Sequence, residues 1–164
     1  MVLNRQAGHA VDLPALRGYV RRLRRELRLG RRDFNLCLVS DREIERLNVA
    51  YRGKHRPTDV LSFPWKGETR QGGNGLCGAE LRGFLGDIVI SMETAHRNAR
   101  LAGHSVWDEI RWLVLHGVLH LLGHDHERDH GEMTGLELAL REQLGIAGAR
   151  ATRRLKRPAK GRHG

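Results

Sequence analysis

The chain has 164 residues, an apolar fraction of 40% and a formal net charge of +10, which together predict one basic globular domain with its own core. No apolar run approaches the length of a membrane span, and the N-terminus has no apolar signal region, so we expect neither a membrane protein nor an exported one. Cys37 and Cys77 form no disulfide or zinc-ligand pattern, which favours the reducing cytoplasm. The basicity indicates a polyanionic partner such as nucleic acid, or else only a genome rich in arginine codons.

The N-terminal half predicts two helices and two strands. Asp12 and Pro14 begin a helix with apolar residues at helical spacing, and Gly30 ends it. Residues 34–39 (FNLCLV) predict a buried strand, and Ser40 caps a second helix. A basic loop at 51–58 leads into a strand over 59–63 that Pro64 stops. The first helix carries six arginines, which form either a solvated face or an RNA-facing surface: Arg17, Arg21, Arg22, Arg24, Arg25 and Arg28.

The C-terminal half predicts one more strand and three helices. After a glycine-rich surface loop at 66–83, residues 85–91 form a strand, and Ser91 caps a helix that ends at Gly103. Ser105 starts a long helix with apolar residues around most of its circumference, so it should lie in the core. Residues 129–145 form a last amphipathic helix.

This order of elements predicts an α+β domain over residues 1–146, with a small mixed β-sheet packed against helices and the long helix in the core. Residues 147–164 carry seven Lys and Arg and no acid, which predicts a disordered basic tail. The tail holds most of the net charge, so the folded body is only weakly basic.

The long helix contains the motif HGVLHLLGHDH at residues 116–126. His116 and His120 are four residues apart, so their imidazoles share one face of the helix. Gly123 favours the left-handed conformation that closes a helix, which lets the chain turn back and bring His126 to the same point. Three imidazoles at this spacing predict one Zn²⁺ per chain with an open fourth position, as in catalytic sites, although Fe, Ni or Co would also suit them.

The residue after the first histidine limits the chemistry. The spacing matches the metalloprotease motif H-E-x-x-H-x-x-G-x-x-H, in which Glu is the general base. Gly117 occupies that position here. A metzincin-like metalloprotease is therefore only an alternative interpretation, and a cation held by neutral ligands favours an anionic substrate such as a phosphodiester.

Three segments read together resemble the YbeY family of bacterial endoribonucleases: 51–64 (YRGKHRPTDVLSFP), 86–91 (GDIVIS) and 116–126. The likeness covers residues 34–144. It implies a compact fold with a metalloprotease-like metal helix. It also implies a cytoplasmic, zinc-dependent endoribonuclease specific for single strands, which matures the 3′ end of small-subunit (16S) ribosomal RNA and takes part in ribosome quality control. Its implied partners are ribosomal RNA and the small ribosomal subunit.

The resemblance also implies roles for individual residues. His116, His120 and His126 match the family's metal ligands, and Arg52 matches an arginine associated with catalysis. A guanidinium pairs bidentately with phosphate, which suits such a role, but Arg52 is otherwise a surface arginine that closes a loop. The neighbouring cations of the same loop are candidates for substrate binding: Lys54 and Arg56.

Two questions stay open at the level of the sequence. His124 stands where the family often has tyrosine, so we do not count it as a metal ligand. If His124 or Asp125 nevertheless closed the coordination sphere, the chain would be a non-catalytic ribosome assembly factor stabilised by zinc. No residue in the motif is an obvious general acid.

Overall fold

Four strands form one mixed sheet in the computed structural model, which describes residues 1–65, 83–124 and 132–147. The strand order is β1-β2-β4-β3, where β1 is parallel to β2, β2 is parallel to β4, and β3 is antiparallel to β4. Their bounds are β1 Val2–Asn4, β2 Asp33–Val39, β3 Val60–Pro64 and β4 Phe84–Ser91. The predicted α+β class and small mixed sheet are confirmed.

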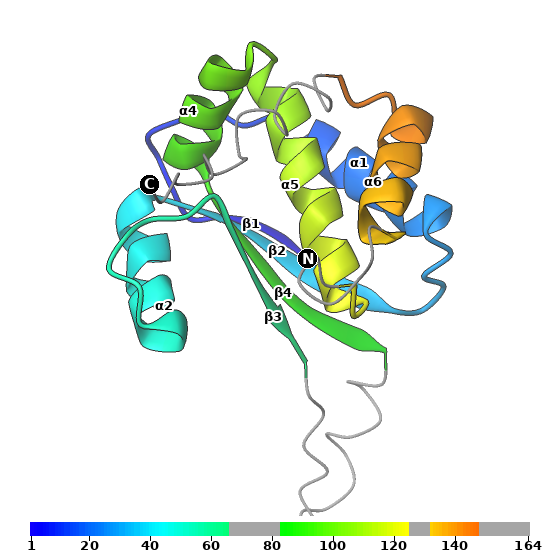
Figure 1. Cartoon of the computed structure of the whole chain (residues 1–164), viewed down its shortest axis with the longest axis horizontal. Coiled ribbons are helices and arrows are strands. Elements are labelled where there is room, and N and C mark those ends of the chain that lie inside the picture. The colour runs from blue at the N-terminus through cyan, green and yellow to red at the C-terminus, as the bar shows by residue number, and fades with distance from the viewer. Residues whose placement is uncertain (66–82, 125–131, 148–164) are drawn as a thin grey trace, which may run out of the picture.

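The helices cover both faces of this sheet, as Figure 1 shows. Alternate residues of β4 point to opposite faces: Ile88 and Ile90 belong to the larger core, whereas Val89 packs in a smaller cluster with Ile44 of α2. The larger core also contains apolar residues of α1, α4, α5 and α6. The helices run over α1 Leu13–Glu26, α2 Asp41–Arg52, α4 Met92–Ala102, α5 Val106–Leu121 and α6 Glu132–Leu144.

Helix α5 is the central element of the larger core, as predicted from its apolar circumference. It contacts strands β3 and β4 and helices α1, α4 and α6. It ends at the predicted glycine: Gly123 has φ +92°, Gly123 N donates to the carbonyl of His120, and His124 N donates to the carbonyl of Leu119 at 3.0 Å. This closure satisfies two carbonyls that the last turn would otherwise leave unpaired.

The start of α2 is tied to α4 by hydrogen bonds to one carboxylate. Asp41 accepts from Thr94 Oγ1 at 2.6 Å and from Arg97 Nη2 at 2.7 Å, and it also accepts from the hydroxyl of Ser91. Burial alone would raise the pKa of Asp41, but these hydrogen bonds outweigh it and lower the pKa below the ordinary value. The carboxylate therefore fixes the direction in which α2 leaves the sheet.

Several predicted boundaries were wrong. The first helix ends at Glu26, and Arg28, not Gly30, first takes the left-handed conformation, with φ +51°. Pro64 lies inside β3 rather than after it, which is possible because β3 is an edge strand. Strand β1 was not predicted because three residues hold no periodic pattern.

Some predictions fall on parts of the chain outside the described residues. These are residues 66–82 of the expected surface loop, His126, and residues 148–164 of the expected tail, so the boundary of the domain stays a prediction. Within the described ranges, no helix has the length and apolar character needed to cross a membrane.

Candidate active site

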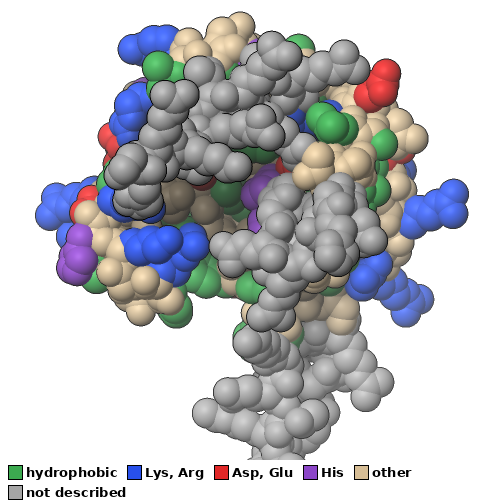
Figure 2. All heavy atoms as spheres, viewed as in Figure 1, with side chains coloured by type: hydrophobic (Ala, Val, Ile, Leu, Met, Phe, Trp, Pro, Cys, Tyr) green, Lys and Arg blue, Asp and Glu red, His purple; other side chains and the backbone are tan. Residues whose placement is uncertain are grey.

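Two histidines converge at the C-terminal end of α5. The Nε2 atoms of His116 and His120 lie 2.9 Å apart, and the ring centroids are 4.5 Å apart. Both side chains are half-buried. Figure 2 shows histidine side chains near the middle of one face, with Lys and Arg side chains on both sides of it. The helical spacing therefore places two imidazole nitrogens at one point, as the sequence predicts.

A buried carboxylate on α6 holds the first of these histidines. Glu137 Oε1 lies 3.0 Å from His116 Nδ1, and Glu137 is 0% exposed. A carboxylate on Nδ1 fixes the tautomer and the ring orientation, so Nε2 presents its lone pair away from α6. This is the arrangement that supports a metal-binding imidazole in many proteins.

Sequence reasoning missed Glu137, although the chain held a signal for it. Glu137 lies three residues before Leu140 and seven before Leu144, and both leucines are buried. An acidic residue on the apolar face of an amphipathic helix needs a buried partner, because an unpaired charge is costly there. The sequence alone does not say that this partner is a histidine 21 residues earlier.

A cation–π contact between α6 and α5 lies next to His116. The guanidinium carbon of Arg141 lies 4.2 Å from the ring centroid of Trp112, and the Trp112 ring is 5.5 Å from the His116 ring. Arg141 is 3% exposed, so the contact is shielded from water. Helix α6 thus contacts α5 both at His116 and one turn before it.

The glycine after His116 faces the sheet. A Cβ atom at Gly117 would lie 2.8 Å from Ile88 Cγ2, closer than real side chains approach. The hydroxyl of Ser62 also donates to the Gly117 carbonyl at 3.3 Å. A glutamate at this position would enter the packed contact between α5 and β4 instead of reaching the histidine nitrogens. The close packing therefore gives a physical reason for the missing peptidase base.

The predicted cations lie in a different segment. Arg52 is the last residue of α2 rather than a loop residue, and Gly53 follows it in the left-handed conformation with φ +65°. Buried Asn48 holds the following loop in place. Its side-chain Nδ2 donates to the Arg56 carbonyl at 2.9 Å, and its backbone carbonyl accepts from Lys54 N at 3.3 Å. The side chains of Arg52, Lys54 and Arg56 are exposed.

The structure therefore brings two of the predicted site residues together and places a third on a different element. His116 and His120 are adjacent, while Arg52 belongs to the helix on the other face of the sheet, across edge strand β3. Among the described residues, which do not include His126, no three metal-ligating side chains form a cluster. The three-histidine ligand set therefore stays a prediction.

A known protein family matches most of the chain. The family model described as endoribonuclease YbeY matches residues 5–145. An endoribonuclease YbeY of Solibacter usitatus is 43% identical over 142 residues, which cover 87% of this chain and 86% of that relative. Another of Nautilia profundicola is 46% identical and covers 70% of this chain and 74% of its own length. The chain therefore belongs to the endoribonuclease YbeY family, which confirms the resemblance seen in its three sequence segments.

A solved structure agrees with this assignment at the level of the fold. The solution structure of TM1509 from Thermotoga maritima superposes with a TM-score of 0.60 at 26% identity. The match covers 98% of this chain and 99% of that one. The fold is thus shared over essentially the whole length of both proteins.

Proposed function

We propose that this endoribonuclease is a zinc-dependent enzyme that cuts single-stranded RNA, matures the 3′ end of 16S ribosomal RNA and acts in ribosome quality control. Its partners would be ribosomal RNA and the small ribosomal subunit, and its compartment the cytoplasm. The observation that carries the proposal is the convergence of the His116 and His120 Nε2 atoms, 2.9 Å apart, with Glu137 behind the first ring.

The residues present fit a transition-metal ion. Two imidazole nitrogens that face each other need a proton or a cation between them, because neutral rings would otherwise oppose two lone pairs. The Glu137 carboxylate makes His116 a stronger donor to such a cation. His126, six residues after His120, would supply the third nitrogen. Zn²⁺ suits this donor set best, and other divalent transition metals are possible. When bound, the ion supplies Lewis acidity and a nucleophile at neutral pH.

The remaining chemistry belongs to the cations at the end of α2. Arg52 is exposed, and its guanidinium can pair bidentately with two phosphoryl oxygens as negative charge develops on them. Exposed Lys54 and Arg56, on the loop that Asn48 pins, would hold neighbouring phosphates. Arg52 would therefore act in catalysis, and the other two would bind substrate.

The first experiment measures cleavage of single-stranded and double-stranded RNA by the purified protein, with and without a chelator. Peptide substrates are tested in parallel. We expect cleavage of the single strand only, its loss with chelator, and its return with Zn²⁺. Cleavage of a peptide, or RNA cleavage that persists in chelator, would contradict the proposal. Four protein ligands in a spectrum of the zinc protein would indicate a structural ion instead.

Arg52→Ala separates metal binding from chemistry. Because Arg52 is exposed and lies on the other side of β3 from the histidines, the variant should keep its zinc and its melting temperature. Loss of one preorganised donor to the transition state typically lowers the rate about a hundredfold to a thousandfold. Arg52→Lys should recover only part of this, since an ammonium cannot form the bidentate pair. The matched control is Arg46→Ala, which removes an exposed arginine from the same helix. A wild-type single-turnover rate in Arg52→Ala would remove Arg52 from the mechanism.

A further inference from the structure

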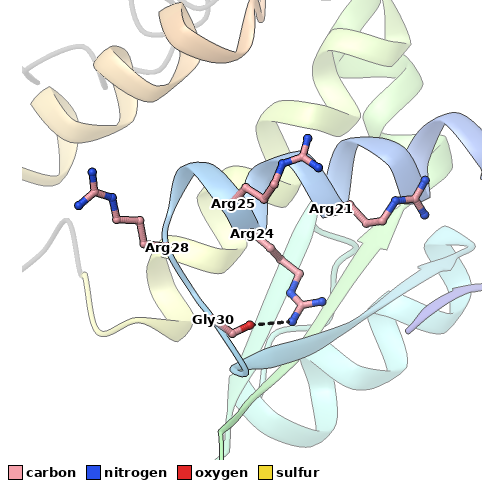
Figure 3. Close-up of a pocket in the computed structure, with 5 residues that line it drawn as sticks. All are labelled: Arg21, Arg24, Arg25, Arg28 and Gly30. Carbon is pink, nitrogen blue, oxygen red and sulfur yellow. Dashed lines mark hydrogen bonds between the residues drawn. The ribbon is translucent and has the colours of Figure 1, made fainter.

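The outer face of α1 carries a row of arginines. At 100° per residue, four of them fall within an arc of about 100°, opposite the buried Leu16, Tyr19 and Leu23, and the fifth follows the helix cap. Four of the five, together with Gly30, line a hollow of about 350 Å³ at the C-terminal end of the helix, shown in Figure 3. The five arginines are Arg17, Arg21, Arg24, Arg25 and Arg28. We call them the α1 arginine face.

Arg24 of this face is bonded within the protein, whereas Arg21, Arg25 and Arg28 can contact a ligand. Arg24 Nη2 donates to the carbonyls of Gly30 at 3.3 Å and Arg32 at 3.1 Å, and its Nε lies 3.7 Å from the carboxylate of Asp33. Arg21, Arg25 and Arg28 are exposed, and they form no ion pair with any residue the structure describes. Like charges three or four residues apart repel each other on a helix. The face is therefore unfavourable to the free protein and would be relieved by a bound anion.

Arg28 also has an unfavourable backbone conformation. Its N donates to the Arg25 carbonyl, and Leu29 N donates to the Arg24 carbonyl, so Arg28 occupies the position after the helix cap where glycine is preferred. Its φ of +51° is strained for any residue with a Cβ. Glycine at this position would adopt the left-handed conformation with less strain. The backbone therefore gives no reason for an arginine at this position.

We propose that the α1 arginine face binds the phosphate backbone of RNA at a site separate from the cleavage site. The proposal rests on the endoribonuclease activity, which makes RNA the polyanion that this protein meets. From Arg17 to Arg25 the helix rises about 12 Å, which matches about three to four phosphates of a stacked strand. Arginine is suited to this task because its planar fork pairs with phosphate oxygens.

Helix α6 contacts both α1 and the histidine pair. Arg22 Nη2 donates to the Gln143 carbonyl of α6 at 3.0 Å, about 9 Å along that helix from Glu137, the partner of His116. The α1 arginine face points to solvent on the far side of α1 from the core. An RNA bound there would therefore contact the protein through nucleotides that flank the cleaved bond.

The test compares two triple variants that lose the same charge. Arg21→Gln/Arg25→Gln/Arg28→Gln changes the face, and Arg42→Gln/Arg46→Gln/Arg100→Gln removes three exposed arginines from α2 and α4. RNA binding is measured by fluorescence anisotropy over a range of salt concentrations. The first variant should lose about 2 from the slope of log K against log salt, at about 0.7 for each single-strand phosphate contact. The control should keep the wild-type slope.

Kinetics and stability give two further readouts. In the face variant the loss should fall on KM rather than kcat, and it should grow as the RNA substrate is lengthened. Arg28→Gly should weaken RNA binding while it raises the melting temperature by about 2–4 °C, because glycine relieves the strained backbone. An arginine with only a structural role would not show this separation of affinity from stability.

The outcomes are distinguishable from those for the proposed function. An unchanged salt slope in the face variant, or an equal change in both variants, would overturn the α1 site while wild-type cleavage leaves the proposed function standing. The same holds if the face variant loses affinity for anionic phospholipid vesicles but not for RNA. Wild-type protein that binds RNA through the α1 face but does not cut it would instead refute the proposed function alone.

Discussion

Replacing Glu137 should weaken metal binding without removing any predicted ligand. Its Oε1 lies 3.0 Å from His116 Nδ1, and the side chains are 1% and 19% exposed. A hydrogen bond to a charged group contributes about 1.5–3 kcal/mol, and about 1.4 kcal/mol corresponds to a factor of ten in affinity. Glu137→Ala should therefore raise the zinc dissociation constant about tenfold to a hundredfold, the usual range for residues that support a ligand.

The assay is competition for zinc with a chelator of known affinity, alongside the melting temperature of each metal-free protein. Glu137→Gln keeps an acceptor of similar shape and loses only the charge, so its effect should be smaller than that of Glu137→Ala. Glu142→Gln on the exposed side of α6 is the matched control. Wild-type zinc affinity in a folded Glu137→Ala variant would refute the reasoning, as would an equal loss in the control.

Three further predictions concern His120, Gly117 and Asp41. His120→Ala should abolish tight metal binding, whereas His124→Ala should not, as measured by metal content per chain. Gly117→Ala should destabilise the protein by up to about 2 kcal/mol, because overpacking against Ile88 costs about 1–3 kcal/mol and helix propensity returns about 1 kcal/mol; a higher urea midpoint would contradict this. Asp41→Asn should lower stability at neutral pH. The folded pKa of Asp41 is lowered, so its contribution is present above the ordinary value of 3.8 and lost as the pH falls through the folded pKa; the variant's pH–stability curve should be flatter in that range.

Local signals in the sequence predicted local structure well. Ser40, Ser91 and Ser105 each accept a hydrogen bond from the backbone N three residues later, as their predicted cap positions require. These signals are reliable because donor and acceptor are separated by only one turn of the chain. The same locality explains the correct prediction that His116 and His120 share one face of α5.

Contacts between distant segments could not be read in the same way. The pairing of Glu137 with His116 depends on how α6 packs against α5, which no local pattern specifies. The place of Arg52 across the edge strand likewise depends on which face of the sheet α2 covers. The left-handed Arg28 was missed because glycine is the usual signal for that conformation, and Gly30 offered a plausible end for the helix.

Gly117 shows how packing and chemistry are linked at one position. In the same helix, His116 and His120 bring their Nε2 atoms together, while position 117 faces β4 so closely that even a Cβ atom would force the Ile88 side chain to move. A metalloprotease needs a carboxylate at this position to act as general base. Here the close approach of α5 to the sheet disfavours one, so no carboxylate at this position would offset the charge of a cation at the histidines. That charge complements a phosphodiester better than a peptide, which is why the spacing of a protease motif is compatible with the activity of an endoribonuclease.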